Sequence, residues 1–160
     1  MLFHLHKYYV VLSFILLFLI SCGKDDNPVT TEDHDEHAEA VGCVIKQSDL
    51  ELVRAAQGQL TGSFSVNENT ESAMLSFFLV AQDGDLFQPE EDHFVLSWTS
   101  ADPQIADIIH YEQDGAWNFR IKGLDAGSTM LQFKVLHGDH ADFVSLDIPV
   151  NVSEDGGGKS

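Results

Sequence analysis

The stretch that decides the fold reads MLQFKVLHGDHADFVSL and spans residues 130–146. Apolar and polar residues alternate on both sides of Gly138-Asp139, which is typical of two antiparallel strands joined by a two-residue turn. Glycine at the first central position suits a type II′ turn, because that position needs a positive φ. The pattern therefore predicts a β-hairpin that turns at residues 138–139.

The register of this hairpin follows from matching apolar residues with apolar residues. On the core side the best match sets three pairs: Val135 with Asp142, Phe133 with Val144, and Leu131 with Leu146. On the outer side it sets two pairs: Lys134 with Phe143, and Gln132 with Ser145.

Two histidines flank the turn in this register and form a cross-strand pair. The Cβ atoms of His137 and His140 are expected about 4.5 to 5.5 Å apart, with Asp142 beside them. Imidazole together with carboxylate suits Zn²⁺, Cu²⁺ or Ni²⁺, whereas Ca²⁺ takes oxygen ligands. We expect a divalent metal site here with zinc as the favoured ion, and a polar hairpin end without a ligand is the alternative.

Short alternating or apolar runs separated by Gly, Asp, Asn and Pro continue through the rest of the chain. Trp117, Phe119 and Ile121, for example, alternate with polar residues, as in a half-buried strand. The pattern predicts an all-β fold, an antiparallel immunoglobulin-like β-sandwich, with no helical segment. The expected strands are residues 41–46, 50–55, 59–66, 74–82, 94–99, 105–111, 117–122, 130–136 and 142–152.

Three stretches in the second half resemble the bacterial immunoglobulin-like group 2 domains. They read LSWTSADPQIA at residues 96–106, GLDAGST at 123–129 and IPVNV at 148–152, within a resemblance that spans roughly residues 70–152. The tryptophan strand, the Gly-x-x-Ala-Gly turn and the closing strand come in that family's order. The resemblance implies a sandwich and, since such domains are mostly adhesion or spacer modules, binding to a protein or glycan partner. The acidic, histidine-bearing loops depart from the family's pattern.

The first residues have the features of a bacterial lipoprotein signal. Lys7 precedes an apolar run over residues 9–20, which is shorter than the roughly 18 to 20 residues of a membrane-spanning helix. The sequence then reaches Leu-Ile-Ser and Cys22, which resembles the lipobox, where the cysteine is acylated. Gly-Lys-Asp-Asp at residues 23–26 resembles the Bacteroidota-type export signal of surface lipoproteins. We expect a lipid on Cys22 that anchors the protein at the outer membrane or cell surface.

These patterns divide the chain into four parts. We expect a signal peptide over residues 1–21, a lipidated cysteine and acidic tether over 22–40, the sandwich over 41–153, and a flexible tail over 154–160. Lipidation of Cys22 leaves Cys43 without a disulfide partner. A buried apolar role for Cys43 in a strand is favoured over a role as a soft metal ligand.

Charge and motifs narrow the classes of partner. The formal net charge is −18, and loss of Lys7 with the signal makes the mature chain more negative still. Nucleic acid is therefore not expected to bind, whereas cations are concentrated in the field of the protein. No nucleophile elbow, phosphate loop, dinucleotide fingerprint or Cys-x-x-Cys pair is present, so no enzyme is expected. The expected partners are the membrane, a metal ion, and an outer-membrane receptor or surface protein.

Further histidines are candidates to complete the metal site. His93 precedes the tryptophan strand, and His34 and His37 lie in the acidic tether, which is equally well interpreted as a solvated segment without a metal. Successive connections of an antiparallel sandwich alternate between its two ends, so counting nine strands predicts all of these, and His110, at the pole of the hairpin. The acidic loop at residues 83–92 is a second candidate, for calcium, although it lacks the ligand spacing of an EF-hand, and a solvated loop without a ligand is the favoured interpretation.

Overall fold

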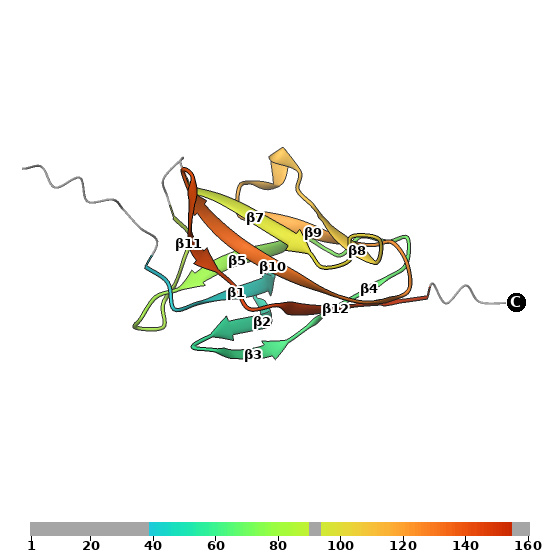
Figure 1. Cartoon of the computed structure of the whole chain (residues 1–160), viewed down its shortest axis with the longest axis horizontal. Helices are drawn as coiled ribbons and strands as arrows, with labels where there is room; N and C mark the ends of the chain where they lie inside the picture. The colour runs from blue at the N-terminus through green and yellow to red at the C-terminus, as the bar shows by residue number, and fades with distance from the viewer. Residues whose placement is uncertain (1–38, 90–93, 155–160) are drawn as a thin grey trace, which may run out of the picture. The chain divides into compact units, whose positions relative to one another are not determined.

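Two β-sheets pack face to face in the computed structural model, which describes residues 39–89 and 94–154 (Figure 1). Within these residues every strand pair is antiparallel except that of β4 with β12. The predicted all-β sandwich is therefore confirmed. The expected signal, most of the expected tether, and the residues after Glu154 lie outside the described ranges.

The larger sheet has the strand order β3-β2-β1-β5-β9-β8, and β6 pairs with β5. Its strands are β1 (Gly42–Gln47), β2 (Leu50–Ala56), β3 (Gln59–Gly62), β5 (Leu75–Val80), β6 (Leu86–Phe87), β8 (Ala106–Ile109) and β9 (Asn118–Gly123). The strands expected at 41–46, 50–55, 74–82, 105–111 and 117–122 are all found here, with small differences at their ends.

The smaller sheet has the order β11-β10-β12-β4, and β7 pairs with β10. Its strands are β4 (Phe64–Asn67), β7 (Phe94–Ser100), β10 (Gly127–His137), β11 (His140–Val144) and β12 (Ile148–Ser153). Strand β10 pairs with β7 over residues 131–137, and it pairs first with β12 and then with β11 along its length. Its eleven residues hold this sheet together.

The core lies between the two sheets and is centred on β10. Leu131, Phe133 and Val135 are fully buried and alternate with outward-facing residues, as a strand with one covered face requires. The Phe133 ring lies 5.6 Å from that of Phe77 and 5.0 Å from that of Phe119, measured between ring centroids. These contacts join the smaller sheet to strands β5 and β9 of the larger one.

Two predicted strands are each divided, which corrects the prediction. Residues 142–152 form β11 and β12 with a break at Ser145. The Ser145 hydroxyl accepts a hydrogen bond from the Phe133 N–H at 2.9 Å and donates one to the Leu146 carbonyl at 2.8 Å. The Ser145 hydroxyl thus replaces a backbone carbonyl as the acceptor for the Phe133 N–H. The chain then continues from β11 into β12 along the same edge of β10.

The second division separates two sheets. Residues 59–66 end in the larger sheet at Gly62 and resume in the smaller sheet at Phe64. Gly62 has a φ of 85°, and a Cβ built on it would lie 1.9 Å from the carbonyl oxygen of Leu52. Only glycine fits this crossover, because it tolerates the positive φ and brings no side chain to the close approach.

Regular helix plays almost no part in the described residues. The chain makes one three-residue 3-10 helix, η2 (Glu112–Asp114), between β8 and β9. No helix within residues 39–89 and 94–154 is long and apolar enough to cross a membrane.

Replacing Gly62 tests the crossover. Gly62→Ala is expected to lower the free energy of unfolding by at least ~2 kcal/mol, because it adds a backbone clash to a strained φ. Gly58→Ala is the matched control: Gly58 has a φ of 76°, but a Cβ added there would meet nothing within 4 Å, so about 1 kcal/mol is expected. Urea denaturation measures both losses. Equal losses would show that the contact with Leu52 does not matter.

Cys43 offers a test of the core. The side chain is fully buried in β1, and burial raises the pKa of its thiol to about 12. Since the thiolate is the reactive form, Cys43 is expected to resist alkylation at pH 8 until the protein unfolds. Labelling of a Cys22→Ser chain with a thiol reagent, with and without urea, measures this. Rapid labelling of the folded chain would contradict a packed β1.

Candidate metal centre

The hairpin of β10 and β11 turns where the sequence predicts. Strand β10 ends at His137 and β11 begins at His140, so the turn holds two residues. Gly138 has a φ of 56°, and Asp139 keeps a negative φ, the pattern of a type II′ turn. His137 and His140 are directly paired across the strands. The expected cross-strand histidine pair is present.

Beyond this pair the predicted register is wrong, because β11 contains a β-bulge. Leu136 pairs with Ala141, but Val135 pairs with Phe143 rather than with Asp142, and Lys134 pairs with Val144. Asp142 is the extra residue, and a bulge of this kind turns two successive side chains toward one face. Phe143 is thereby packed against the core, with its ring centroid 6.4 Å from that of Phe77.

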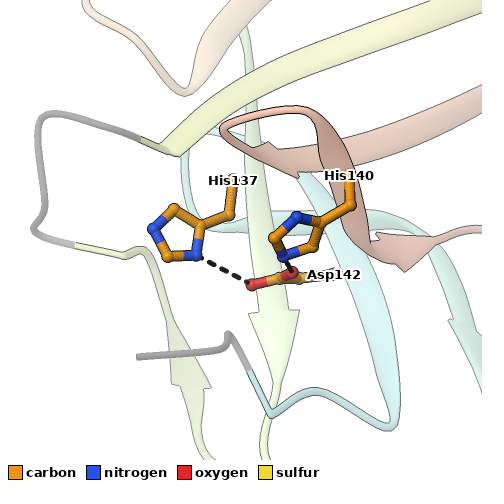
Figure 2. Close-up of side chains that lie close together, drawn as sticks. All are labelled: His137, His140 and Asp142. Carbon is orange, nitrogen blue, oxygen red and sulfur yellow. Dashed lines mark ion pairs between the residues drawn. The ribbon is translucent and has the colours of Figure 1, made fainter. Parts of the chain in front are cut away.

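The bulge brings three potential metal ligands together (Figure 2). The His140 Nε2 atom lies 3.1 Å from the Oδ1 atom of Asp142, and the His137 Nδ1 atom lies 3.7 Å from the Oδ2 atom. One donor atom from each residue can be chosen so that all three lie within 4.8 Å of one another. Figure 2 shows both imidazole rings turned toward the same carboxylate, one at each oxygen.

Burial differs sharply among the three side chains. The Asp142 side chain is 2% exposed, that of His137 is 20% exposed and that of His140 is 58% exposed. The carboxylate thus lies at the base of the cluster, and His140 lies at the solvent side. Both imidazoles therefore flank a buried carboxylate.

The spacing of the donor atoms fits a small divalent ion. Zinc bonds to nitrogen and oxygen at about 2.0 to 2.2 Å, so two donors of a tetrahedral site are separated by about 3.4 Å. The His140 nitrogen is 3.1 Å from one Asp142 oxygen and the His137 nitrogen is 3.7 Å from the other. Donor atoms chosen one from each residue lie within 4.8 Å of one another, so their separations are near this value without all being equal to it. Two imidazoles and one carboxylate also match the donors that Zn²⁺, Cu²⁺ and Ni²⁺ accept.

Phe94 supports the cluster, and sequence reasoning did not single it out for this role. It is paired with His137 across β7 and β10, and the two rings stack with centroids 4.6 Å apart and an angle of 28° between their planes. This packing limits the rotation of the His137 ring. The alternation of residues 94–98 indicates that Phe94 faces the core, but the pairing of β7 with β10 is not local and no short-range signal reveals it.

Four residues predicted to bind metal or lipid fall outside the described ranges: His34, His37, His93 and Cys22. Their roles stay predictions. Counting connections predicts that the tether meets the sandwich at the hairpin's pole. Val41 and Gly42, at the start of β1, line a hollow of about 120 Å³ together with Phe143 and Val144, and the tether itself lies outside the described residues.

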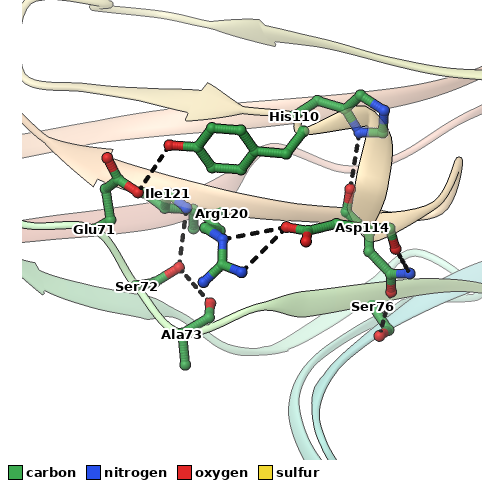
Figure 3. A network of polar contacts seen from close by, with 10 residues as sticks. Glu71, Ser72, Ala73, Ser76, His110, Asp114, Arg120 and Ile121 are labelled. Atoms are coloured by element: carbon green, nitrogen blue, oxygen red, sulfur yellow. Dashed lines mark hydrogen bonds and ion pairs between the residues drawn. The ribbon is translucent and has the colours of Figure 1, made fainter.

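The structure does not bring His110 into the cluster, which corrects the prediction that all these histidines meet. The His110 Nδ1–H donates to the Asn118 carbonyl at 2.9 Å, and its ring centroid is 6.4 Å from that of Trp98 (Figure 3). Trp98 is four residues along β7 from Phe94, about 13 Å at the rise of a strand. His110 instead helps to hold the connection between β8 and β9.

That connection is fixed by a polar network of its own (Figure 3). Arg120 donates two hydrogen bonds to one carboxylate oxygen of Asp114, at 3.1 and 3.2 Å. The Tyr111 hydroxyl donates to the Glu71 carboxylate at 3.3 Å, and Lys122 pairs with the other Glu71 oxygen at 3.5 Å. Because Asp114 is paired with Arg120 and Glu71 with Lys122, these acidic side chains fix the connection between β8 and β9. The hairpin of β10 and β11 therefore remains the candidate metal centre.

The described part of the acidic loop does not gather ligands for calcium. The Asp83 carboxylate accepts a hydrogen bond from the Asp85 backbone N–H at 3.1 Å, which stabilises the turn before β6. Within residues 39–89 and 94–154 the hairpin cluster is the one group of three or more metal-ligating side chains, and it does not include Cys43. Glu90, Glu91 and Asp92 lie outside the described ranges.

Comparison with known proteins gives a distant structural likeness. No protein-family model matches the chain, and no curated protein matches it. Among solved structures, the chain is similar to the crystal structure of the S-layer protein SbsC domains 4 and 5, with 18% sequence identity and a TM-score of 0.41. The match covers 69% of this chain and 53% of that one, so the chain spans about half of that structure. A likeness at this level carries no argument about family or function.

Proposed function

We propose that this protein is a lipoprotein, anchored through Cys22 at the outer membrane or cell surface, that binds a divalent transition metal. The metal site is the pole of the sandwich formed by His137, His140 and Asp142, and zinc is the favoured ion. The observation that carries the proposal is the convergence of three donor atoms within 4.8 Å of one another on one short hairpin. The strongly negative charge of the chain favours the approach of a cation.

A second candidate function is a metal-independent interaction module. The outward face of the smaller sheet exposes 54% of Val95 and 48% of Val144 on either side of β10. We propose this face as the alternative contact surface for a partner protein or glycan, as the resemblance to immunoglobulin-like modules implies. Binding by such a face would be indifferent to chelators, whereas binding through the metal centre would be lost on chelation.

Substitution of the histidine pair tests the metal centre. The double variant His137→Ala/His140→Ala is expected to lose more than about 100-fold in affinity for Zn²⁺, because two of three ligands are removed. Isothermal titration of the full chain with Zn²⁺, Cu²⁺, Ni²⁺ and Ca²⁺ measures this, and His110→Ala is the matched control. Unchanged zinc affinity in the double variant would contradict the assignment, and tight binding of calcium alone would contradict a transition-metal site.

A companion variant distinguishes the loss of metal ligands from unfolding of the hairpin. Removing both imidazoles leaves the Asp142 carboxylate without these neighbours in a buried position, which could itself destabilise the hairpin. The triple variant His137→Gln/His140→Gln/Asp142→Asn removes that charge, and it is expected to keep the circular dichroism spectrum of the native sheet. It is also expected not to bind zinc. Full zinc affinity in this folded variant would exclude the site.

Lipidation is tested separately. Metabolic labelling with palmitate in a bacterial host is expected to mark the protein and to leave Cys22→Ser unmarked, because the thiol of Cys22 is the expected acceptor. Fractionation of the cells should move the unmarked variant from the membrane to the soluble fraction. Equal labelling of both proteins would contradict the anchor and would leave the metal centre unaffected.

A further inference from the structure

The outer face of the larger sheet carries a hollow of about 260 Å³. It is lined by residues of β2 and β3, of the turn between them, and of the turn that follows β5, and the two turns lie at the same end of the sheet (Figure 1). Val41 connects the two sides, because its N–H donates to the Val80 carbonyl at 2.8 Å and its carbonyl accepts from the Gln57 N–H at 3.1 Å. The hollow and the metal centre have no described residue in common.

Small side chains create this hollow. Ala56 and Val80 each follow a residue of the core, so they face the outer side of the sheet. Across the order β3-β2-β1-β5, the residues paired in one row are Gln59, Ala56, Gly42 and Val80. A Cβ built on Gly42 would lie 2.4 Å from that of Ala56, so this position has no room for a side chain. The row is therefore recessed between Gln59 and Val80.

Two ordered turns hold polar residues at the rim. Gln57 and Gly58 have φ values of 53° and 76°, as the two central residues of a type I′ turn require. Asparagine and glycine are the usual residues there, and a side chain as long as glutamine is uncommon. In the turn that carries Gln82, the Gly84 N–H donates to the Ala81 carbonyl at 3.0 Å. Because these turns are already ordered, a ligand that binds between them pays little for ordering the chain.

The lining offers hydrogen-bonding groups with little net charge. It contains a threonine hydroxyl and three amide groups, each of which both donates and accepts: Thr61, Gln57, Gln59 and Gln82. Arg54 is the one charged residue among the described residues that line the hollow. Its guanidinium is matched by Glu51 through two hydrogen bonds, at 2.7 and 2.9 Å.

We propose that this hollow binds a single neutral sugar ring of a glycan. Each hydroxyl of a sugar donates and accepts a hydrogen bond, as the amide and hydroxyl groups of the lining do. The C–H groups of the ring can pack against Val80 and Ala56, which supply apolar surface. Clefts for drug-sized ligands hold about 300 to 1,000 Å³, so a volume of about 260 Å³ suits one ring.

Charge favours a neutral ligand over an ion. The formal net charge of −18 repels anions from the protein as a whole. A cation would meet the guanidinium of Arg54, and no carboxylate belongs to the described lining of the hollow. A sugar without charge is subject to neither effect. Its binding is also independent of the metal centre.

Nuclear magnetic resonance of the ¹⁵N-labelled full chain, with Cys22→Ser to prevent lipidation, tests the hollow. Glucose, galactose, mannose and N-acetylglucosamine are titrated separately. At least one of them is expected to shift the signals of Gln57, Gln59 and Gln82 saturably, with one sugar for each chain. Addition of a chelator is expected to leave these shifts unchanged.

Two variants of exposed residues identify the site. Gln59→Ala and Gln82→Ala remove amides from β3 and from the turn after β5, and each is expected to weaken sugar binding by roughly five-fold or more. Gln104→Ala, which removes an exposed glutamine outside the lining, is the matched control and is expected to bind as the unaltered chain does.

The outcomes separate this site from the metal centre. The absence of a saturable response to any of the four sugars would overturn the inference, as would equal affinity in the unaltered chain and both glutamine variants. A response to N-acetylglycinamide alone would assign the hollow to a peptide backbone and would also overturn it. Loss of sugar binding in His137→Ala/His140→Ala or on chelation would place the sugar at the metal centre instead. Failure to bind zinc would leave the sugar site standing.

Discussion

The packing of Phe133 between the two sheets is the contact on which the rest of the structure depends. Its ring lies 5.6 Å from Phe77 and 5.0 Å from Phe119, and these residues belong to separate strands of the opposite sheet. Because side chains alternate along a strand, fixing Phe133 inward also fixes which residues of β10 face the core. A shift of one residue would expose Leu131, Phe133 and Val135 together, so the register of β10 has little freedom.

The same alternation determines where the proposed metal centre lies. His137 is the next inward position after Val135, so it continues the core-facing column to the mouth of the sandwich. The tight turn at residues 138–139 then returns the chain with His140 directly opposite. This much could be predicted from the sequence, because the alternation and the Gly-Asp turn are local signals. Neither signal depends on how the distant parts of the chain fold.

The bulge at Asp142 could not be predicted in the same way. Regular alternation allows either Asp142 or Phe143 to face the core, and matching of apolar residues within the hairpin selected Asp142. Phe143 is drawn inward by Phe77, which belongs to the other sheet and lies far away in the sequence. The extra residue in β11 satisfies both demands, since it places Phe143 against the core and keeps Asp142 beside the histidines. The stacking of Phe94 on His137 escaped prediction for the same reason, as did the crossover at Gly62.

The proposed metal centre lies away from the contacts that stabilise the core. The buried Asp142 carboxylate belongs to the shortest ladder of β10, at the tip of the hairpin. The core contacts of β10 with β7 and β12 do not pass through it. Binding of a cation would then stabilise chiefly the hairpin end, by an amount that grows with the concentration of free metal. Changes at the hairpin tip are therefore expected to leave the packing of Phe133 in place.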